Sequence, residues 1–124
     1  AVLEQFREKQ FTGTGREIDV ARTLGEIHRE QGHLREAARQ FQAAVELGAS
    51  PDEAVELNYL AGICLKEAGD FEGALGAYAM SIESDDKTNS FRLSALAQTA
   101  DLCEQDGNFD GALAAYRDLG WALK

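Results

Sequence analysis

The stretch DGNFDG, which begins at Asp106, holds the side chains of this sequence best suited to binding a metal ion. Asp106, Asn108 and Asp110 have the spacing of the first three oxygen ligands of a calcium-binding loop, and a glycine follows at the bend. Such a loop needs a bidentate glutamate at its twelfth position, where this sequence has Arg117. Because the same stretch also aligns with a turn that recurs in the chain, we expect a helix connection and no metal site.

Two further candidate sites have simpler explanations. In TGTGRE, residues 12–17, glycines precede an expected helix whose N-terminus could hold an anion, but the sequence has no dinucleotide fingerprint and no phosphate-loop lysine. His28 and His33 stand five positions apart, which is not the i, i+4 spacing of two metal ligands on one helix face. Since nothing resembles a catalytic triad or a paired acid and base, we expect no catalytic residue, no cofactor and no enzyme activity.

The two cysteines, Cys64 and Cys103, form neither a CxxC motif nor a spacing typical of zinc sites. Each lies among apolar residues, so we expect both to pack as small apolar side chains, in preference to a disulfide or a reactive thiol. Few cysteines and no recognisable signal peptide favour a reducing compartment, and the cytoplasm is the predicted location.

Composition restricts the class of partner. The 124 residues are 44% hydrophobic and 27% charged, as in a globular domain, and no apolar run is long enough to span a membrane. The net charge is −10, and residues 48–124 hold fourteen acidic against five basic side chains. Such a field repels a phosphate backbone, so we expect no nucleic acid and no membrane, and a basic or apolar protein partner.

One sequence motif recurs three times along the chain, as QGHLREAARQF, AGDFEGALGAY and DGNFDGALAAY, and the candidate residues above are placed relative to these copies. Their glycines Gly32, Gly69 and Gly107 are 37 and 38 residues apart. A fixed period of this length without strand-like alternation is typical of a helical solenoid, in which each copy is a helix, a turn and a second helix. The sequence also predicts helix starts, with Ser50 as N-cap before Pro51 and with Thr14 as a second cap.

The pattern resembles the tetratricopeptide repeat, whose signature places a Leu-Gly pair in the first helix, a glycine in the turn, and alanines and an aromatic in the second helix. The resemblance implies an all-α, right-handed solenoid of three repeats plus a partial N-terminal helix. It also implies a protein-binding module that is not an enzyme. The matching residues, copy by copy, are Leu24, Gly25, His28, Gly32, Leu34, Ala37, Phe41 and Ala44; Ala61, Gly62, Leu65, Gly69, Phe71, Ala74, Tyr78 and Ser81; and Thr99, Ala100, Cys103, Gly107, Phe109, Ala112, Tyr116 and Leu119.

The repeat predicts a single domain with four parts. Val2 and Phe6 stand at the spacing of Ala37 and Phe41, which indicates the second helix of an upstream repeat. The expected parts are a partial helix and link over 1–15, and repeats over 16–50, 51–87 and 88–124.

Three glycines fall inside predicted second helices: Gly73, Gly76 and Gly111. A glycine there costs about 1 kcal/mol relative to alanine, so it needs a structural reason. We expect these glycines to let neighbouring helices approach closely and stack with the aromatic residues of the copies. Those aromatics are Phe71, Tyr78, Phe109 and Tyr116.

By the resemblance, the first helices of the repeats line a concave groove with an apolar centre and a charged rim, which suits a partner peptide or helix. An alternative is that longer helices bury Leu60 and Ile63 against their neighbours. Some family members clamp a terminal carboxylate with Lys, Asn and Arg, but only Arg22 is suitable here, so that function is not transferred. The predicted groove residues are Arg22, Glu26, Tyr59, Leu60, Ile63, Lys66, Gln98 and Asp101.

The function predicted from the sequence is therefore a non-enzymatic protein interaction module. One alternative is a structural scaffold or self-association segment of a longer repeat protein, in which Trp121 would contact a second copy in a homo-oligomer. Another is a regulatory domain of a larger enzyme or transcription factor.

Overall fold

The computed structural model describes the backbone of residues 15–123 and the side chains of residues 15–120. Within these residues the regular secondary structure is all helix, with no strand, which confirms the predicted all-α solenoid of helical hairpins. The predicted upstream helix with Val2 and Phe6, the cap Thr14, and the side chain of Trp121 lie outside the described residues. The helices are α2 (Gly15–Glu30), α3 (Leu34–Glu46), α4 (Pro51–Glu67), α5 (Phe71–Ile82), α6 (Ser90–Gln105) and α7 (Phe109–Leu123).

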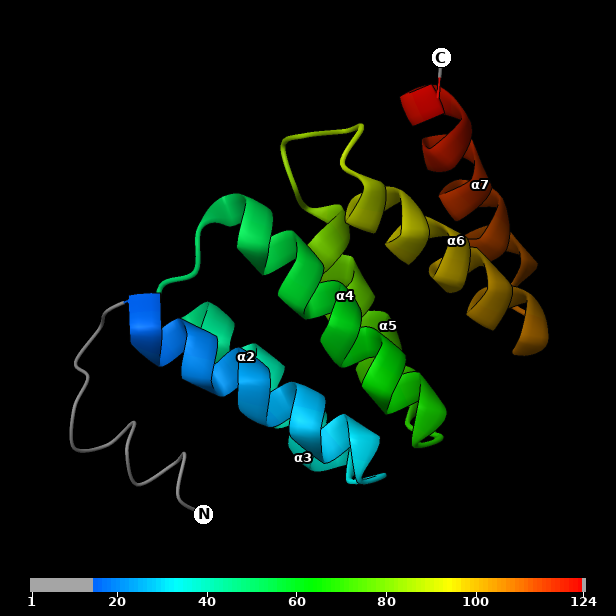
Figure 1. Cartoon of the computed structure of the whole chain (residues 1–124). Coiled ribbons are helices and arrows are strands. Elements are labelled where there is room, and N and C mark those ends of the chain that lie inside the picture. The colour runs from blue at the N-terminus through cyan, green and yellow to red at the C-terminus, as the bar shows by residue number, and fades with distance from the viewer. Residues whose placement is uncertain (1–14, 124) are drawn as a thin grey trace.

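The helices pack as three antiparallel hairpins, α2 with α3, α4 with α5, and α6 with α7. The hairpins join because α3 packs on α4 and α5 packs on α6, and α4 also contacts α6. Figure 1 shows α2, α4 and α6 in one row, with α3 and α5 behind α2 and α4. This row places the first helices of all three hairpins on one face of the molecule.

Each hairpin turns at a glycine with a left-handed backbone. Gly32, Gly69 and Gly107 have φ angles of 81°, 84° and 77°, a region that residues with a Cβ rarely adopt. After each glycine, the next backbone N–H reaches back across the turn, as His33 does to the carbonyl of His28 at 2.8 Å. The repeat period in the sequence is therefore the period of this helix-ending turn.

Side-chain caps fix where the helices begin. The Ser50 hydroxyl accepts a hydrogen bond from the N–H of Glu53 at 3.2 Å, and Pro51 opens α4, as predicted. Asp70 and Asn108 use a carboxylate and an amide oxygen in the same way for α5 and α7. The stretch DGNFDG thus forms a turn and a helix cap, and Asn108 serves the cap.

Among the glycines of the described residues, Gly25 and Gly62, both in first helices, lie closest to a side chain of another helix. A Cβ on Gly25 would lie 2.7 Å from the buried ring of Phe41, and a Cβ on Gly62 would overlap the ring of Tyr78. In the first two hairpins, the aromatic ring of the second helix therefore rests on the glycine of the first helix. This contact explains why the Leu-Gly or Ala-Gly pair stands where it does.

The prediction that Gly73 and Gly76 let helices approach closely is wrong. A Cβ on Gly73 would meet the capping carboxylate of Asp70, and one on Gly76 would meet nothing within 4 Å. Gly111 leaves room both for a helix cap and for a neighbouring helix. A Cβ there would crowd the capping side chain of Asn108 and lie 3.1 Å from the sulfur of Cys103 on α6.

The predicted stacking of four aromatic residues is correct only for Tyr78, which is fully buried. Phe71, Phe109 and Tyr116 are exposed to 51%, 68% and 49%. Within the described residues no further helix covers α7, so the ring of Tyr116 lacks the neighbour that buries Tyr78. Its hydroxyl donates a hydrogen bond to Glu104 at 2.5 Å instead.

Within the described residues, the core consists of three clusters of buried side chains along the row of hairpins, and it is built largely of alanine with a few large side chains. Its largest fully buried side chains include Phe41 and Leu57 in the cluster between the first two hairpins, and Tyr78 in the cluster between the second and third. Cys64 and Cys103 are both free and buried, as expected. Burial raises the pKa of the Cys64 thiol, which keeps the sulfur neutral.

Candidate partner-binding face

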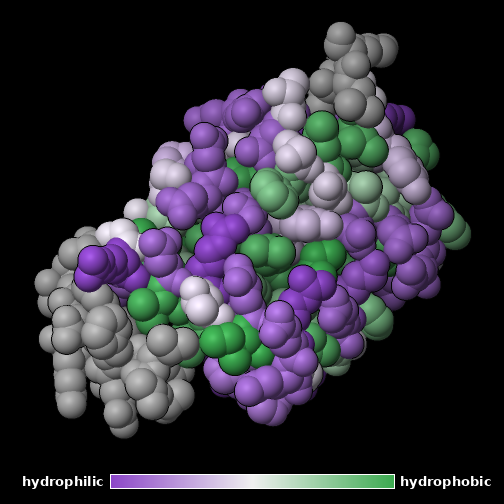
Figure 2. All heavy atoms as spheres, viewed as in Figure 1, coloured by the Kyte–Doolittle hydropathy of each residue, from purple (hydrophilic) through white to green (hydrophobic). Residues whose placement is uncertain are grey.

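The row of α2, α4 and α6 forms the candidate site, called here the first-helix face. A groove of 520 Å³ lies on it between α2 and α4. Figure 2, seen from the same side as Figure 1, shows a largely hydrophilic surface on this side, interrupted by hydrophobic patches. The groove is lined by Arg22, Glu26, Arg29, Glu30, Phe41, Glu56, Leu60 and Glu67.

Ion pairs cross this groove from α2 to α4. Arg22 bonds to Glu56 on α4 and lies 3.7 Å from Glu26 on its own helix. Two turns further along, Arg29 bonds to Glu67 at 2.8 Å, and this hydrogen bond raises the pKa of the Arg29 guanidinium. The arginines of α2 thus pair with glutamates of α4, which adds to the packing of α3 against both helices.

A second polar contact links α4 to α6. The Lys66 ammonium donates to the side-chain oxygen of Gln98 at 2.6 Å and lies 3.6 Å from the Asp101 carboxylate. These three side chains were predicted as groove residues, and the structure brings them together with one another. They do not line the groove between α2 and α4.

Tyr59 and Ile63 are half-buried and pack on the core between α4, α5 and α6. The ring of Tyr59 lies with its centroid 6.0 Å from that of Tyr78 and 5.9 Å from that of Phe91. Both residues therefore combine a partly exposed surface with a packing role, and neither lines the groove. Of the eight predicted residues, those that line it are Arg22, Glu26 and Leu60.

Sequence reasoning missed Arg29 and Glu30 at the end of α2. The available signal was helical spacing, because Arg29 follows Arg22 by seven residues and so lies on the same helix face. What the spacing did not reveal is the partner, since the residue that pairs with Arg29 is 38 positions away.

The groove is acidic although most of its charges are paired. Two arginines face four glutamates, and within the described residues Glu30 makes no ion pair. The half-buried Leu60 supplies apolar surface beside these charges, whereas the ring of Phe41 is buried beneath the groove. Within the same residues, no group of three or more His, Cys, Asp or Glu side chains could hold a metal ion. The arrangement suits contacts to a basic segment with an apolar side chain.

A model of the tetratricopeptide repeat family matches residues 22–89, more than half of the chain. The chain therefore belongs to the tetratricopeptide repeat family. The match contains the whole of α3, α4 and α5 and most of α2, and so includes the entire groove.

Repeats of this family generally mediate protein–protein interactions and are typically not enzymes. In a comparison with curated proteins, nothing matches the chain. Among the helices that the structure describes, none is both long and apolar enough to cross a bilayer.

Proposed function

We propose that this chain is a non-enzymatic interaction module that binds a basic, partly apolar segment of a partner protein on its first-helix face. The observation that carries the proposal is the groove between α2 and α4, which combines the half-buried Leu60 with an excess of carboxylates. A lysine or arginine of the partner would meet Glu26 and Glu30, while an apolar side chain would cover Leu60.

The mechanism of binding is preorganisation. Because α3 packs on both α2 and α4, and the part-exposed ion pairs Arg22–Glu56 and Arg29–Glu67 add to this packing, the groove exists before any partner arrives and the module loses little conformational freedom on binding. The net charge of −10 adds long-range attraction for a basic partner. The free, buried Cys64 and Cys103 support a reducing compartment such as the cytoplasm.

A second candidate function is a scaffold in which α7 contacts another molecule. The observation that favours it is the exposed apolar surface of Phe109, Leu113 and Tyr116 on that helix. The predicted self-association residue Trp121 belongs to the same helix. A regulatory role within a larger protein is compatible with either surface.

Selection of random peptides displayed on phage, followed by fluorescence polarisation with the selected peptides, tests the proposed function. We expect enrichment of lysine or arginine next to apolar residues, and binding that weakens with salt. The double variant Glu26→Lys/Glu30→Lys should bind such a peptide at least about tenfold more weakly. The charge-matched control Glu36→Lys/Glu46→Lys, on α3, should bind like the parent. Acidic selected peptides, or equal loss in both variants, would contradict the proposal.

A further inference from the structure

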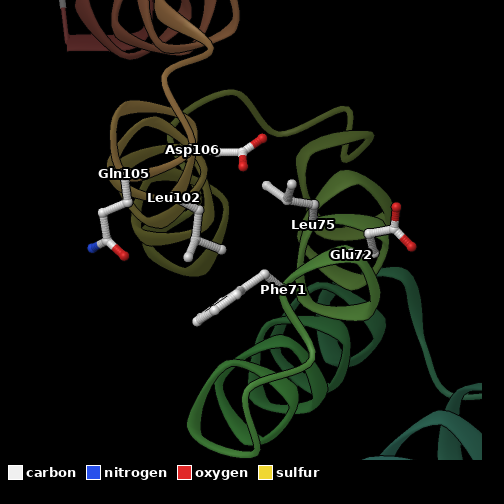
Figure 3. Close-up of a pocket in the computed structure, with 6 residues that line it drawn as sticks. All are labelled: Phe71, Glu72, Leu75, Leu102, Gln105 and Asp106. Atoms are coloured by element: carbon white, nitrogen blue, oxygen red, sulfur yellow. The ribbon is translucent and has the colours of Figure 1, made fainter.

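A second groove lies where α5 begins and α6 ends, away from the groove between α2 and α4. It has a volume of 350 Å³ and is called here the junction groove. Figure 3 shows Leu75, Leu102 and Phe71 directed into the space between the two helices, with Asp106 beside them and Glu72 and Gln105 at the outer edges. Leu102 is buried and Leu75 half-buried, whereas Phe71 remains exposed, so an apolar surface is open to solvent.

The helix connections explain why the groove is open. Residues 83–89 connect α5 to α6 at the far end of the helix pair, and Arg92 secures that end by bonding to the carbonyls of Ile82 and Lys87. The start of α5 and the end of α6 have no such connection to each other. Phe71 and Leu102 therefore stand at the unconnected end, where a side chain can enter between them.

The junction between the first two hairpins is a matched comparison within the molecule. It has a groove of 320 Å³ lined by Leu34, Arg35 and Ala68, among others. Counted from the turn glycines, Glu72 replaces Arg35 and Asp106 replaces Ala68. The second junction thus carries a carboxylate on each helix where the first carries a cation and a methyl group.

These two carboxylates are available to a partner. Glu72 and Asp106 are exposed, and within the described residues neither side chain makes a hydrogen bond or an ion pair. Aspartate and glutamate beside an apolar groove attract a cation carried on an apolar segment. A second copy of this chain is disfavoured as the occupant, because two molecules of net charge −10 repel each other.

We propose that the junction groove binds a short segment of another protein in which an aliphatic side chain is flanked by lysine or arginine. The aliphatic side chain enters between Phe71, Leu75 and Leu102, while one flanking cation contacts Asp106 beside the groove and the other contacts Glu72 at its outer edge. This surface is separate from the first-helix face, so one partner with two basic segments, or two partners, can bind one molecule.

The test uses NMR titration of the labelled protein with a synthetic peptide that has a central leucine between pairs of lysines. We expect saturable shifts of the amide signals of residues 71–75 and 102–106. Peptides with serine in place of the leucine, or glutamates in place of the lysines, should bind at least about tenfold more weakly.

Matched variants assign the binding to this groove. Glu72→Lys/Asp106→Lys should lower the affinity for the peptide by about tenfold or more. Phe71→Ala should lower it by a similar factor through loss of apolar contact. Glu83→Lys/Asp85→Lys makes the same change in net charge at the far end of α5 and should leave binding within about twofold. Circular dichroism and melting temperature establish that each variant is folded.

Three results would overturn the inference. Shifts confined to α2 and α4 would place the peptide on the first-helix face, which supports the proposed function but not the junction groove. Absence of saturable shifts would show that the groove does not recognise this chemistry. A concentration-dependent mass in light scattering that Glu72→Lys/Asp106→Lys abolishes would show that a second copy occupies the groove.

Discussion

At the residue scale, two glycines in neighbouring helices have opposite environments. Gly62 in α4 lies under the ring of Tyr78, while Gly76 in α5 faces solvent, and a methyl group added there would meet no atom within 4 Å. Alanine has a higher helix propensity than glycine by about 1 kcal/mol at both positions, so any difference between them reports on packing.

We expect Gly62→Ala to lower the free energy of unfolding by about 1–3 kcal/mol, because the added methyl group displaces the Tyr78 ring from α4. Gly76→Ala should raise the same free energy by about 0.5–1 kcal/mol through helix propensity alone. Urea unfolding of both variants measures the two effects. A stabilising Gly62→Ala would show that the ring can move without cost.

Tyr78 is fully buried, and within the described residues its hydroxyl has no hydrogen-bond partner. Burying an unpaired hydroxyl costs free energy, so Tyr78→Phe should leave stability near neutral pH unchanged or raise it by up to about 1 kcal/mol. Thermal and urea unfolding provide the measurement. A loss of more than about 1 kcal/mol would mean that the hydroxyl is hydrogen-bonded.

Tyr78 should also make the free energy of unfolding depend on pH. Burial, the largest cause, and nearby Tyr59 raise the pKa of Tyr78 above its ordinary value of 10.0. The unfolded phenol therefore ionises first. The contribution of Tyr78 to stability is complete below pH 10.0 and is lost as the pH rises from there toward the folded-state pKa. Unfolding of Tyr78→Phe should show a shallower decline over that alkaline range, and an identical decline in both proteins would refute this assignment.

At the element scale, the junction between α5 and α6 depends on one buried cation. The Arg92 guanidinium donates from Nε to the carbonyl of Ile82 at 2.9 Å and from Nη1 to that of Lys87 at 3.1 Å. Ile82 is the last residue of α5, so Arg92 supplies that helix end with a side-chain partner. The same arginine lies in the first turn of α6, close to the cap Asn89.

We expect Arg92→Ala to lower the free energy of unfolding by about 2–4 kcal/mol, because it leaves both carbonyls without their charged donor. Arg92→Lys should recover little of this loss, since a single ammonium cannot reproduce the planar donors of the guanidinium. Arg39→Ala, at an exposed position of α3, should change stability by no more than about 0.5 kcal/mol. Chemical denaturation of the three variants makes the comparison. Small and equal changes in the free energy of unfolding for all three variants would show that the connection over residues 83–89 holds α5 and α6 together without Arg92.

At the scale of the whole molecule, stability should vary along the row of hairpins. In a solenoid each repeat contacts only its neighbours, so local opening depends on how many sides of a helix are covered. Within the described residues, α4 packs on α3, α5 and α6, whereas α7 packs mainly on α6.

Hydrogen exchange measures this gradient. We expect the amides of α4 to exchange most slowly and those of α7 fastest among the described helices, because opening α7 exposes the least additional apolar surface. The exposed rings of Phe109 and Tyr116 already indicate how little of α7 is covered. Uniform exchange from α2 to α7 would instead show that the three hairpins unfold as one unit.

The sequence by itself determined the hairpins, because their signals are local. The glycines Gly32, Gly69 and Gly107 can adopt a backbone that ends a helix, and Ser50 with Pro51 can start one, whatever surrounds them. These few residues were enough to predict the number of copies and the helical class of the fold.

Only the tertiary structure decided which side chains meet across hairpins. Arg22 bonds to a residue 34 positions away, Arg29 to one 38 positions away, and Lys66 to one 32 positions away. Such pairs depend on how far each helix is rotated and shifted against the next, which the periodicity of a single helix does not specify. For the same reason, the sequence could place Tyr59 and Leu60 on neighbouring faces of one helix, but the packing of α2, α5 and α6 decided that Leu60 lines a groove and Tyr59 joins an aromatic cluster.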